Sequence, residues 1–213
     1  MVPADAEIII EGEIIPGVKE IVDPFGEVTR HYQAQCIRQA MQVKAVTHRS
    51  NAIMQDVFSG HHEHWNIGAI PKEGSVYNTL KSKVGNVTAV HMPMSGIGRL
   101  SCYVSIKKVK EGQGKLTALV ALNESWTFEV VVVVDEDIDV FNEIDVNWAL
   151  LNFVDPQKDV NLIGNVGRSV FTTEMGYNKI VIDSTRPLDK PFPTMFKVPA
   201  PALEAISPDE WLD

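Results

Sequence analysis

Three histidines stand close together in the polar stretch from Ser59 to Asn66, at His61, His62 and His64. Imidazole nitrogens bind transition metals well, so the cluster is a candidate metal site. Its spacing is not one that established zinc motifs use. We therefore interpret the stretch as a solvated polar loop and assign no metal ligand to it.

A second group of possible ligands follows the five consecutive valines Val130–Val134, where Asp135, Asp137 and Asp139 alternate along the chain. Carboxylates in such a row could hold magnesium through oxygen. Acidic residues are also expected just before a helix, where they favour the positive end of its dipole, and Asn142 offers an N-cap there. We favour this structural interpretation.

The cysteines and glycines suggest less chemistry. Cys36 and Cys102 lie far apart, with no metal-type spacing and no evident base nearby, so free thiols in a reducing cytoplasm are the simplest expectation. The glycines of Ser95–Gly98 lack the strand-to-helix context of a dinucleotide-binding loop. We assign no role to any of these residues.

Size and charge limit the function classes. The chain has 213 residues, which suits one large domain or two small ones, and a net charge of −9, which argues against nucleic-acid or anionic-membrane partners. No apolar run approaches the ~20 residues that a membrane span needs. The N-terminus has no signal-peptide pattern.

The elements that position these residues differ between the two halves of the chain. Five valines in a row indicate a strand buried on both faces, and the helix after Asn142 places Ile144, Trp148 and Leu151 on one apolar face. The first half is β-rich: we expect strands at 6–15, 41–49, 53–58 and 87–92, a break at Pro16-Gly17, loops at 18–31 and 59–66, and a helix at 73–83.

From about residue 100 the pattern alternates between strand and helix. We expect strands at 100–109, 160–163 and 179–183, a helix at 115–123, and a capping box at 207–210 in the proline-rich tail. Strands separated by helices imply right-handed crossovers and a mainly parallel sheet. The fold class is α/β, or α+β over the whole chain.

Several separated segments, in order, resemble the C-terminal half of the UbiD family of decarboxylases, which use prenylated FMN on aromatic and α,β-unsaturated acids. The segments are AEIIIEGEIIPG (6–17), DPFGE (23–27), VKAVTHRSNAIMQ (43–55), VSIKK (104–108), VVVDEDIDVF (132–141), VNWAL (146–150) and KIVIDST (179–185). The segment GAIPKEGSVYN (68–78) is most similar to the branch acting on hydroxylated benzoic acids, such as protocatechuate decarboxylases.

The resemblance implies an architecture in three parts. Residues 1–99 would be the C-terminal part of a split β-barrel that binds the flavin. Residues 100–186 would form a doubly wound α/β domain used for oligomerisation, and residues 187–213 a tail. Family enzymes are more than twice as long, so we expect this chain to be a fragment or a natural subunit. Its partner would supply the N-terminal half, with a catalytic arginine and the ligands for a divalent metal and potassium.

The resemblance also implies a proton donor. Of the two glutamates in the family's E-G-P-F-G-E motif, the second matches Glu27, whereas the first falls on Val22, with Glu20 or Asp23 as possible replacements. Loss of CO2 leaves a carbanion-like carbon attached to the flavin adduct, and an acid in apolar surroundings, which Pro24 and Phe25 could supply, would protonate it. The alternative is an ordinary surface turn with a solvated Glu27.

One of Lys107 and Lys108, at the end of a strand, would match a family lysine that reaches the flavin phosphate. The alternative is a pair of solvated lysines. The function implied is a UbiD-like non-oxidative (de)carboxylase that works with a partner chain. A non-catalytic assembly module, with the tail docked on a neighbouring subunit, and a free-standing flavin-binding domain are the other hypotheses.

Overall fold

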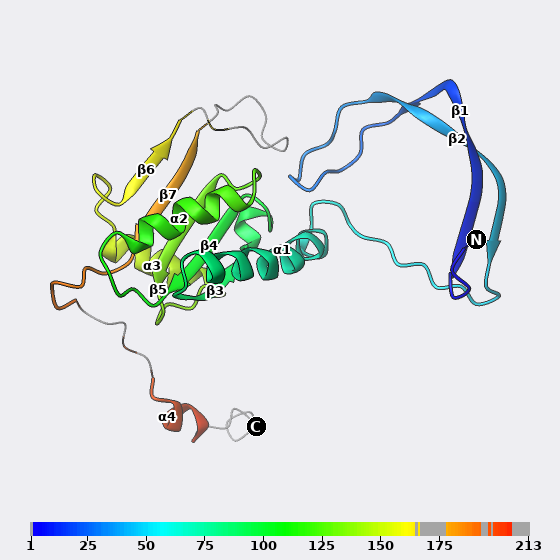
Figure 1. Ribbon diagram of the computed structural model, residues 1–213. Helices are drawn as coiled ribbons and strands as arrows, with labels where there is room; N and C mark the ends of the chain where they lie inside the picture. The colour runs from blue at the N-terminus through cyan, green and yellow to red at the C-terminus, as the bar shows by residue number, and fades with distance from the viewer. Residues whose placement is uncertain (1, 165, 167–177, 193–195, 197, 206–213) are drawn as a thin grey trace.

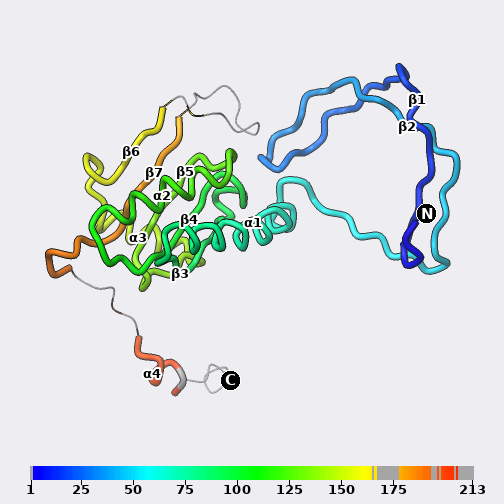
Figure 2. Tube along the Cα trace, in the orientation of Figure 1, coloured from blue at the N-terminus to red at the C-terminus, as the bar shows by residue number. Residues whose placement is uncertain are grey.

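The protein consists of a long two-stranded ribbon and an α/β body, as the computed structural model shows (Figures 1 and 2). The structure describes residues 2–164, 166, 178–192, 196 and 198–205. A coil leads from the ribbon to the first helix of the body. The predicted capping box at 207–210 lies outside the described residues.

The ribbon pairs β1 (Ile8–Val22) with β2 (Cys36–His48) in antiparallel register. The expected break at Pro16-Gly17 is an irregularity in the pairing rather than the end of a strand: the register shifts between Ile14 and Lys19, and Gly17 takes a φ of 84°. Such an irregularity absorbs a proline that cannot donate a ladder hydrogen bond. The strand therefore also takes in the first part of the predicted 18–31 loop.

The body is built on one five-stranded sheet, in the order β3-β4-β5-β7-β6. The three central strands are parallel and the two edge strands, β3 and β6, are antiparallel to their neighbours, so the sheet is mainly parallel. The strands are β3 (Val87–His91), β4 (Ser101–Ile106), β5 (Val130–Asp135), β6 (Val160–Ile163) and β7 (Lys179–Ser184).

Helices cover both faces of this sheet. The helices are α1 (His62–Lys83), α2 (Gln113–Glu124) and α3 (Glu143–Phe153), with a short 3-10 turn, η1 (Met94–Gly96), before β4 and a short α4 (Ala200–Glu204) in the tail. Residues of α1 and α2 share one apolar core with one side of the sheet, whereas α3 joins the core on the other side. Val131–Val134 are buried between the two layers, which confirms the predicted two-sided burial.

Helix α1 is the largest departure from the predicted elements. It has 22 residues, whereas only 73–83 was predicted as helix, and the predicted strand at 53–58 and loop at 59–66 are wrong. Pro71 and two glycines interrupt the helical pattern in sequence. Burial of Trp65, Ala69, Val76 and Leu80 along one side outweighs these weak helix formers. Helix α1 and strand β3, which we assigned to the 1–99 region, both pack in the α/β body.

Helix α3 starts where predicted but packs through the opposite face. The Asn142 side chain accepts the Ile144 N–H at 3.0 Å, which confirms the N-cap. The buried residues are Val146 and Ala149, whereas Ile144 and Leu151 are 77% and 87% exposed. The residues before α3 place Ile138 and Val140 in the core on this side of the sheet, and the small Ala149 lets the helix lie close.

Both cysteines are free thiols, as expected. Cys102 is fully buried in β4, and this burial, with the nearby negative charge of Glu73, raises the pKa of its thiol. A raised pKa makes the thiol a poor nucleophile. Among the described residues, no helix has the length and apolar character to cross a bilayer.

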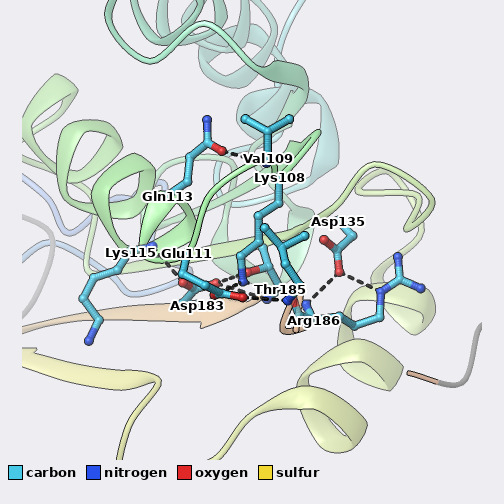
Figure 3. Close-up of polar contacts among 10 residues, drawn as sticks. Lys108, Val109, Glu111, Gln113, Lys115, Asp135, Asp183, Thr185 and Arg186 are labelled. Carbon is cyan, nitrogen blue, oxygen red and sulfur yellow. Dashed lines mark hydrogen bonds and ion pairs between the residues drawn. The ribbon is translucent and has the colours of Figure 1, made fainter. Parts of the chain in front are cut away.

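Helix α2 has an N-cap that is supplied from a distant strand. Its first turn begins at Gly112 without a capping side chain, and the Asp183 carboxylate at the end of β7 accepts the Lys115 N–H at 2.9 Å (Figure 3). The other oxygen accepts from the Thr185 N–H and hydroxyl. Gly114 leaves the space for this carboxylate, because a Cβ there would collide with it.

The substitution Gly114→Ala should therefore destabilise the chain, although alanine is the better helix former. We expect a loss of about 2 kcal/mol in the free energy of unfolding, from overpacking and the displaced cap. Gly74→Ala in α1 is the matched control: a Cβ there meets nothing within 4 Å, so the change should stabilise by up to ~1 kcal/mol. Thermal or urea unfolding checks both, and equal effects at the two positions would contradict the role of Gly114 in making room for the Asp183 carboxylate.

Candidate functional site

The loop between β1 and β2 folds into a closed turn around Glu27. Gly26 forms an isolated bridge with Tyr32, the Glu27 N–H donates to the His31 carbonyl at 2.9 Å, and the Arg30 N–H donates to the Glu27 carbonyl at 3.0 Å. Arg30 takes the left-handed conformation, with φ of 65°, to close the turn. The predicted surface loop is thus a compact, hydrogen-bonded structure.

Two contacts attach this turn to the body. The indole N–H of Trp65, in the first turn of α1, donates to the carbonyl of the buried Val28 at 2.8 Å. Gly60 lies so close that a Cβ there would be 2.8 Å from the Glu27 carbonyl, and its φ of 71° also favours glycine. The position of Glu27 is therefore fixed relative to the start of α1.

A cavity of about 810 Å³ opens beside this turn. Its walls come from the Glu27 turn, from the coil that follows β2, and from the first residues of α1. The lining residues are Gly26, Glu27, Arg30, His31, Tyr32, Asp56, Val57, Phe58, Ser59, Gly60, His61, His62, Glu63 and Trp65. A cavity of this size accommodates a drug-sized or cofactor-sized ligand.

Glu27 lines the cavity and its carboxylate is held by two donors. Oε1 accepts from Gln33 Nε2 at 2.5 Å and Oε2 accepts from the Val28 N–H at 3.0 Å. The side chain is therefore held in the cavity wall rather than released into bulk water. The expectation that Phe25 supplies apolar surroundings is not met within this chain, because Phe25 is 45% exposed.

The three histidines lie at the start of α1 rather than in a loop, and His61 and His62 are exposed, as the solvated interpretation expects. His61 occupies the N-cap position, and the N–H of Gly60 donates to His64 Nδ1 at 3.2 Å. A row of rings forms on the cavity wall, since His61 stacks on His62 at 5.0 Å between centroids and His62 contacts Trp65 at 5.4 Å. Among the residues that the structure describes, no cluster of three or more metal-ligating side chains occurs.

None of the residues considered for the family's first glutamate lines this cavity. In the strand register, Val22 lies opposite Cys36 at the end of the ribbon and Glu20 lies opposite Arg38. The exposed Asp23 carboxylate accepts a hydrogen bond from the Gln35 side chain at 3.3 Å. The carboxylates that do join Glu27 in the lining are Asp56 and Glu63. Sequence reasoning missed them, and Arg30 too, because the fold alone brings the 56–63 coil beside the turn.

The predicted phosphate lysines lie in different surroundings. Lys107 is exposed after β4, whereas the Lys108 side chain is only 4% exposed. Lys108 Nζ donates to the Arg186 carbonyl at 2.9 Å and pairs with Glu111 at 2.8 Å (Figure 3). Hydrogen bonds from the Leu188 N–H and from Lys108 lower the pKa of Glu111.

Glu27 and the two lysines are not brought together. The Glu27 turn contacts the first turn of α1, whereas the Lys107 N–H donates to Asn86, just beyond the end of that helix. A helix of 22 residues spans about 33 Å. Within one chain, in this arrangement, a mononucleotide beside Glu27 does not reach Lys107 or Lys108.

The three aspartates that follow the valine run, Asp135, Asp137 and Asp139, each have a hydrogen-bond or ion-pair partner within the chain. Asp135 accepts from the Arg186 Nε at 2.9 Å, Asp137 pairs with the same guanidinium, and Asp139 accepts the Phe141 N–H at 2.9 Å. Burial lowers the pKa of the Arg186 guanidinium, but the two carboxylates outweigh this effect and raise the pKa overall. The guanidinium lies over the Phe153 ring. Asp135 and Asp137 are thus used in ion pairs with Arg186, and Asp139 in a turn, rather than in the helix-dipole role that we expected.

Comparison with known proteins gives two matches that together span nearly the whole chain. Residues 1–62 match the 3-octaprenyl-4-hydroxybenzoate carboxy-lyase Rift-related domain, and residues 65–184 match the C-terminal domain of the same carboxy-lyase. These are the UbiD and UbiD_C family models. The boundary between them falls at the start of α1, where the Glu27 turn meets the body.

Curated relatives and solved structures agree with this result. The chain is 32% identical over 187 residues to the anhydromevalonate phosphate decarboxylase of Methanothermobacter thermautotrophicus, covering 86% of this chain and 44% of the relative. It is 33% identical over 199 residues to the phenolic acid decarboxylase of Sedimentibacter hydroxybenzoicus, covering 88% and 40%.

A structure of the UbiD-class enzyme HmfF from Pelotomaculum thermopropionicum in complex with FMN superimposes with a TM-score of 0.88 at 33% identity, covering 99% of this chain and 48% of that one. An evolved dimeric form of HmfF in complex with prFMN gives a TM-score of 0.84 at 34% identity, covering 99% and 46%. The chain thus spans about half the length of the relatives it matches. With both family domains matched in order, the chain belongs to the UbiD family.

Proposed function

We propose that this chain is the C-terminal part of a UbiD-type non-oxidative (de)carboxylase, with Glu27 as the proton donor. The observation that carries the proposal is the Glu27 carboxylate, fixed by two donors in the wall of a cavity of about 810 Å³. The substrate class is an aromatic or α,β-unsaturated carboxylic acid. The cofactor is prenylated FMN, since matched UbiD-class structures hold prFMN or FMN.

Glu27 would complete the reaction by protonating the carbon that has lost CO2. Prenylated FMN, when bound, would supply the electron sink. A proton donor must lie within hydrogen-bond reach of the reacting atom, and a side chain fixed in a cavity wall meets this requirement better than a mobile one. The carboxylate left after transfer is stabilised by the two donors already in place.

The cavity lining offers ring surfaces for a planar ligand, and it holds one guanidinium, that of Arg30, beside the three carboxylates of Glu27, Asp56 and Glu63. The rings of Tyr32, His61 and His62 offer stacking surfaces, and the Arg30 guanidinium offers positive charge for a carboxylate or phosphate. These residues would hold the flavin or the substrate beside Glu27. The role of Lys107 or Lys108 on the phosphate stays a prediction, and in this arrangement it requires a flavin bound by another chain.

The ribbon carries an exposed apolar face that an N-terminal half could cover. Register places Ile10 opposite Val46 and Ile14 opposite Met41, on one face, and these four side chains are between 47% and 61% exposed. An isolated two-stranded ribbon is only marginally stable in water, and a bare apolar face on it favours association. We infer that strands of an N-terminal UbiD-like half cover this face, and that the divalent metal and potassium are bound mainly there.

An assembly role is the second candidate. Phe141, Ile144 and Leu151 lie along one side of α3 and its N-terminal approach, and all three are more than 60% exposed. Such an apolar stripe is typical of an interaction surface. The module would then contribute contacts to a larger complex without taking part in the chemistry.

The substitution Glu27→Gln tests the catalytic proposal. In the enzyme assembled with its N-terminal half and prenylated FMN, CO2 release should fall by roughly 10²–10⁴-fold, because the amide cannot donate a proton to carbon. Glu11→Gln is the matched control, since Glu11 is exposed on the ribbon outside the cavity lining, and its activity should stay within about twofold. Equal activities of the two variants would sink the assignment of Glu27.

Two neighbouring positions on β2 test the partner surface. Met41→Glu places a charge on the apolar face beside Ile14, whereas Gln42→Glu places the same charge on the opposite face, beside Glu13. We expect the Kd for the N-terminal half to rise at least about tenfold for Met41→Glu and to change less than about threefold for Gln42→Glu. Because both side chains are exposed in this chain, the Tm of the chain alone should change little. Equal Kd values would exclude this face as the partner surface.

A further inference from the structure

We propose that Gln33 is a positioning residue that sets the protonation of Glu27 through a direct side-chain hydrogen bond. The inference rests on the proposed role of Glu27 as proton donor. Its basis is the shortest contact that Glu27 makes, in which Gln33 Nε2 donates to Oε1 at 2.5 Å. Gln33 is not among the residues that line the cavity, so it acts on Glu27 rather than on the ligand.

The turn fixes Gln33 independently of its side chain. Its backbone N–H donates to the Phe25 carbonyl at 2.9 Å, next to the bridge between Gly26 and Tyr32. Both ends of the Gln33–Glu27 contact therefore belong to one small hydrogen-bonded unit. The amide is held on Oε1 while the Val28 N–H occupies Oε2, and the carboxylate keeps one orientation in the wall.

The chemistry of an amide suits a carboxyl group that alternates between two states. With Glu27 ionised, the Nε2–H group of Gln33 donates to the carboxylate and stabilises the negative charge. With Glu27 protonated, rotation of the amide presents Oε1, which accepts the carboxylic O–H. When Glu27 gives its proton to the substrate carbon, a C–H bond forms, the O–H bond breaks, and the electron pair stays on the carboxylate. Solvent then returns the proton.

The consequence is a pH profile that depends on Gln33. Removing the amide donor takes away stabilisation of the ionised form, so Glu27 stays protonated to higher pH. In the assembled enzyme carrying Gln33→Met, the decline of kcat at high pH should shift to higher pH by about one unit. Gln33→Glu should also move it upward, because two adjacent carboxyl groups share a proton. Both variants keep the backbone bond to Phe25.

The matched control is Gln35→Met. Gln35 belongs to the same turn, donates from an exposed position to Asp23 at 3.3 Å, and is not part of the cavity lining. Its pH profile should coincide with that of the unmodified enzyme. A decline that stays in place in Gln33→Met, or that moves equally in Gln35→Met, would overturn the proposal.

A second measurement is independent of activity. In the 213-residue chain labelled with ¹⁵N, the side-chain amide signal of Gln33 should shift as the carboxyl groups titrate between about pH 3 and pH 7, and the shift should vanish in Glu27→Gln. A Gln33 signal that does not respond to Glu27 would overturn the contact itself. If the contact titrates but Glu27→Gln leaves CO2 release intact, the proposed function fails and the positioning role in catalysis fails with it.

Discussion

The hydrogen bond from the Trp65 indole to the Val28 carbonyl is the constraint on which the site depends. It joins the turn that carries Glu27 to the first turn of α1, and the carbonyl and the indole N–H are both removed from water. A buried polar group left without its partner costs about 1–3 kcal/mol, so this bond resists separation of the turn from the body. The cavity lies beside this contact, and the coil 56–61 forms part of its wall.

The carboxyl ends of the parallel strands and the start of α1 differ in how their charged groups are paired. At the carboxyl ends of the parallel strands, where such sheets commonly bind ligands, Asp183 caps α2, Lys108 pairs with Glu111, and Arg186 pairs with Asp135 (Figure 3). The same guanidinium also pairs with Asp137. The charged groups in this cluster are paired with one another. The cavity with Glu27 lies instead at the start of α1, at the boundary between ribbon and body, and this is where we propose that the chemistry takes place.

Much of the α/β body could be predicted from the sequence, because its signals are local. A few neighbouring residues are enough to predict each of these elements: the valine run predicts a buried strand, Asn142 an N-cap, and the alternation after residue 100 a mainly parallel sheet. The full length of helix α1 could not be predicted, because Pro71 disfavours a helix in sequence. The helix is stabilised by tertiary burial of Trp65 and Leu80. The cavity residues Asp56 and Arg30 also escaped, because no local pattern reports which coil will lie beside which turn.

The contacts that orient Glu27 and the contacts that would cover the ribbon have different sources. The hydrogen bonds that orient Glu27 come from Gln33 and Val28, all within one turn of this chain. The apolar cover of the ribbon is, by contrast, missing from the same chain, with Ile14 and Met41 left half-exposed. Under the proposed function, the proton donor would be oriented before any partner binds, and water would leave the site only when the partner covers it. Orientation without desolvation would then keep the acid in place but inactive until the two halves associate.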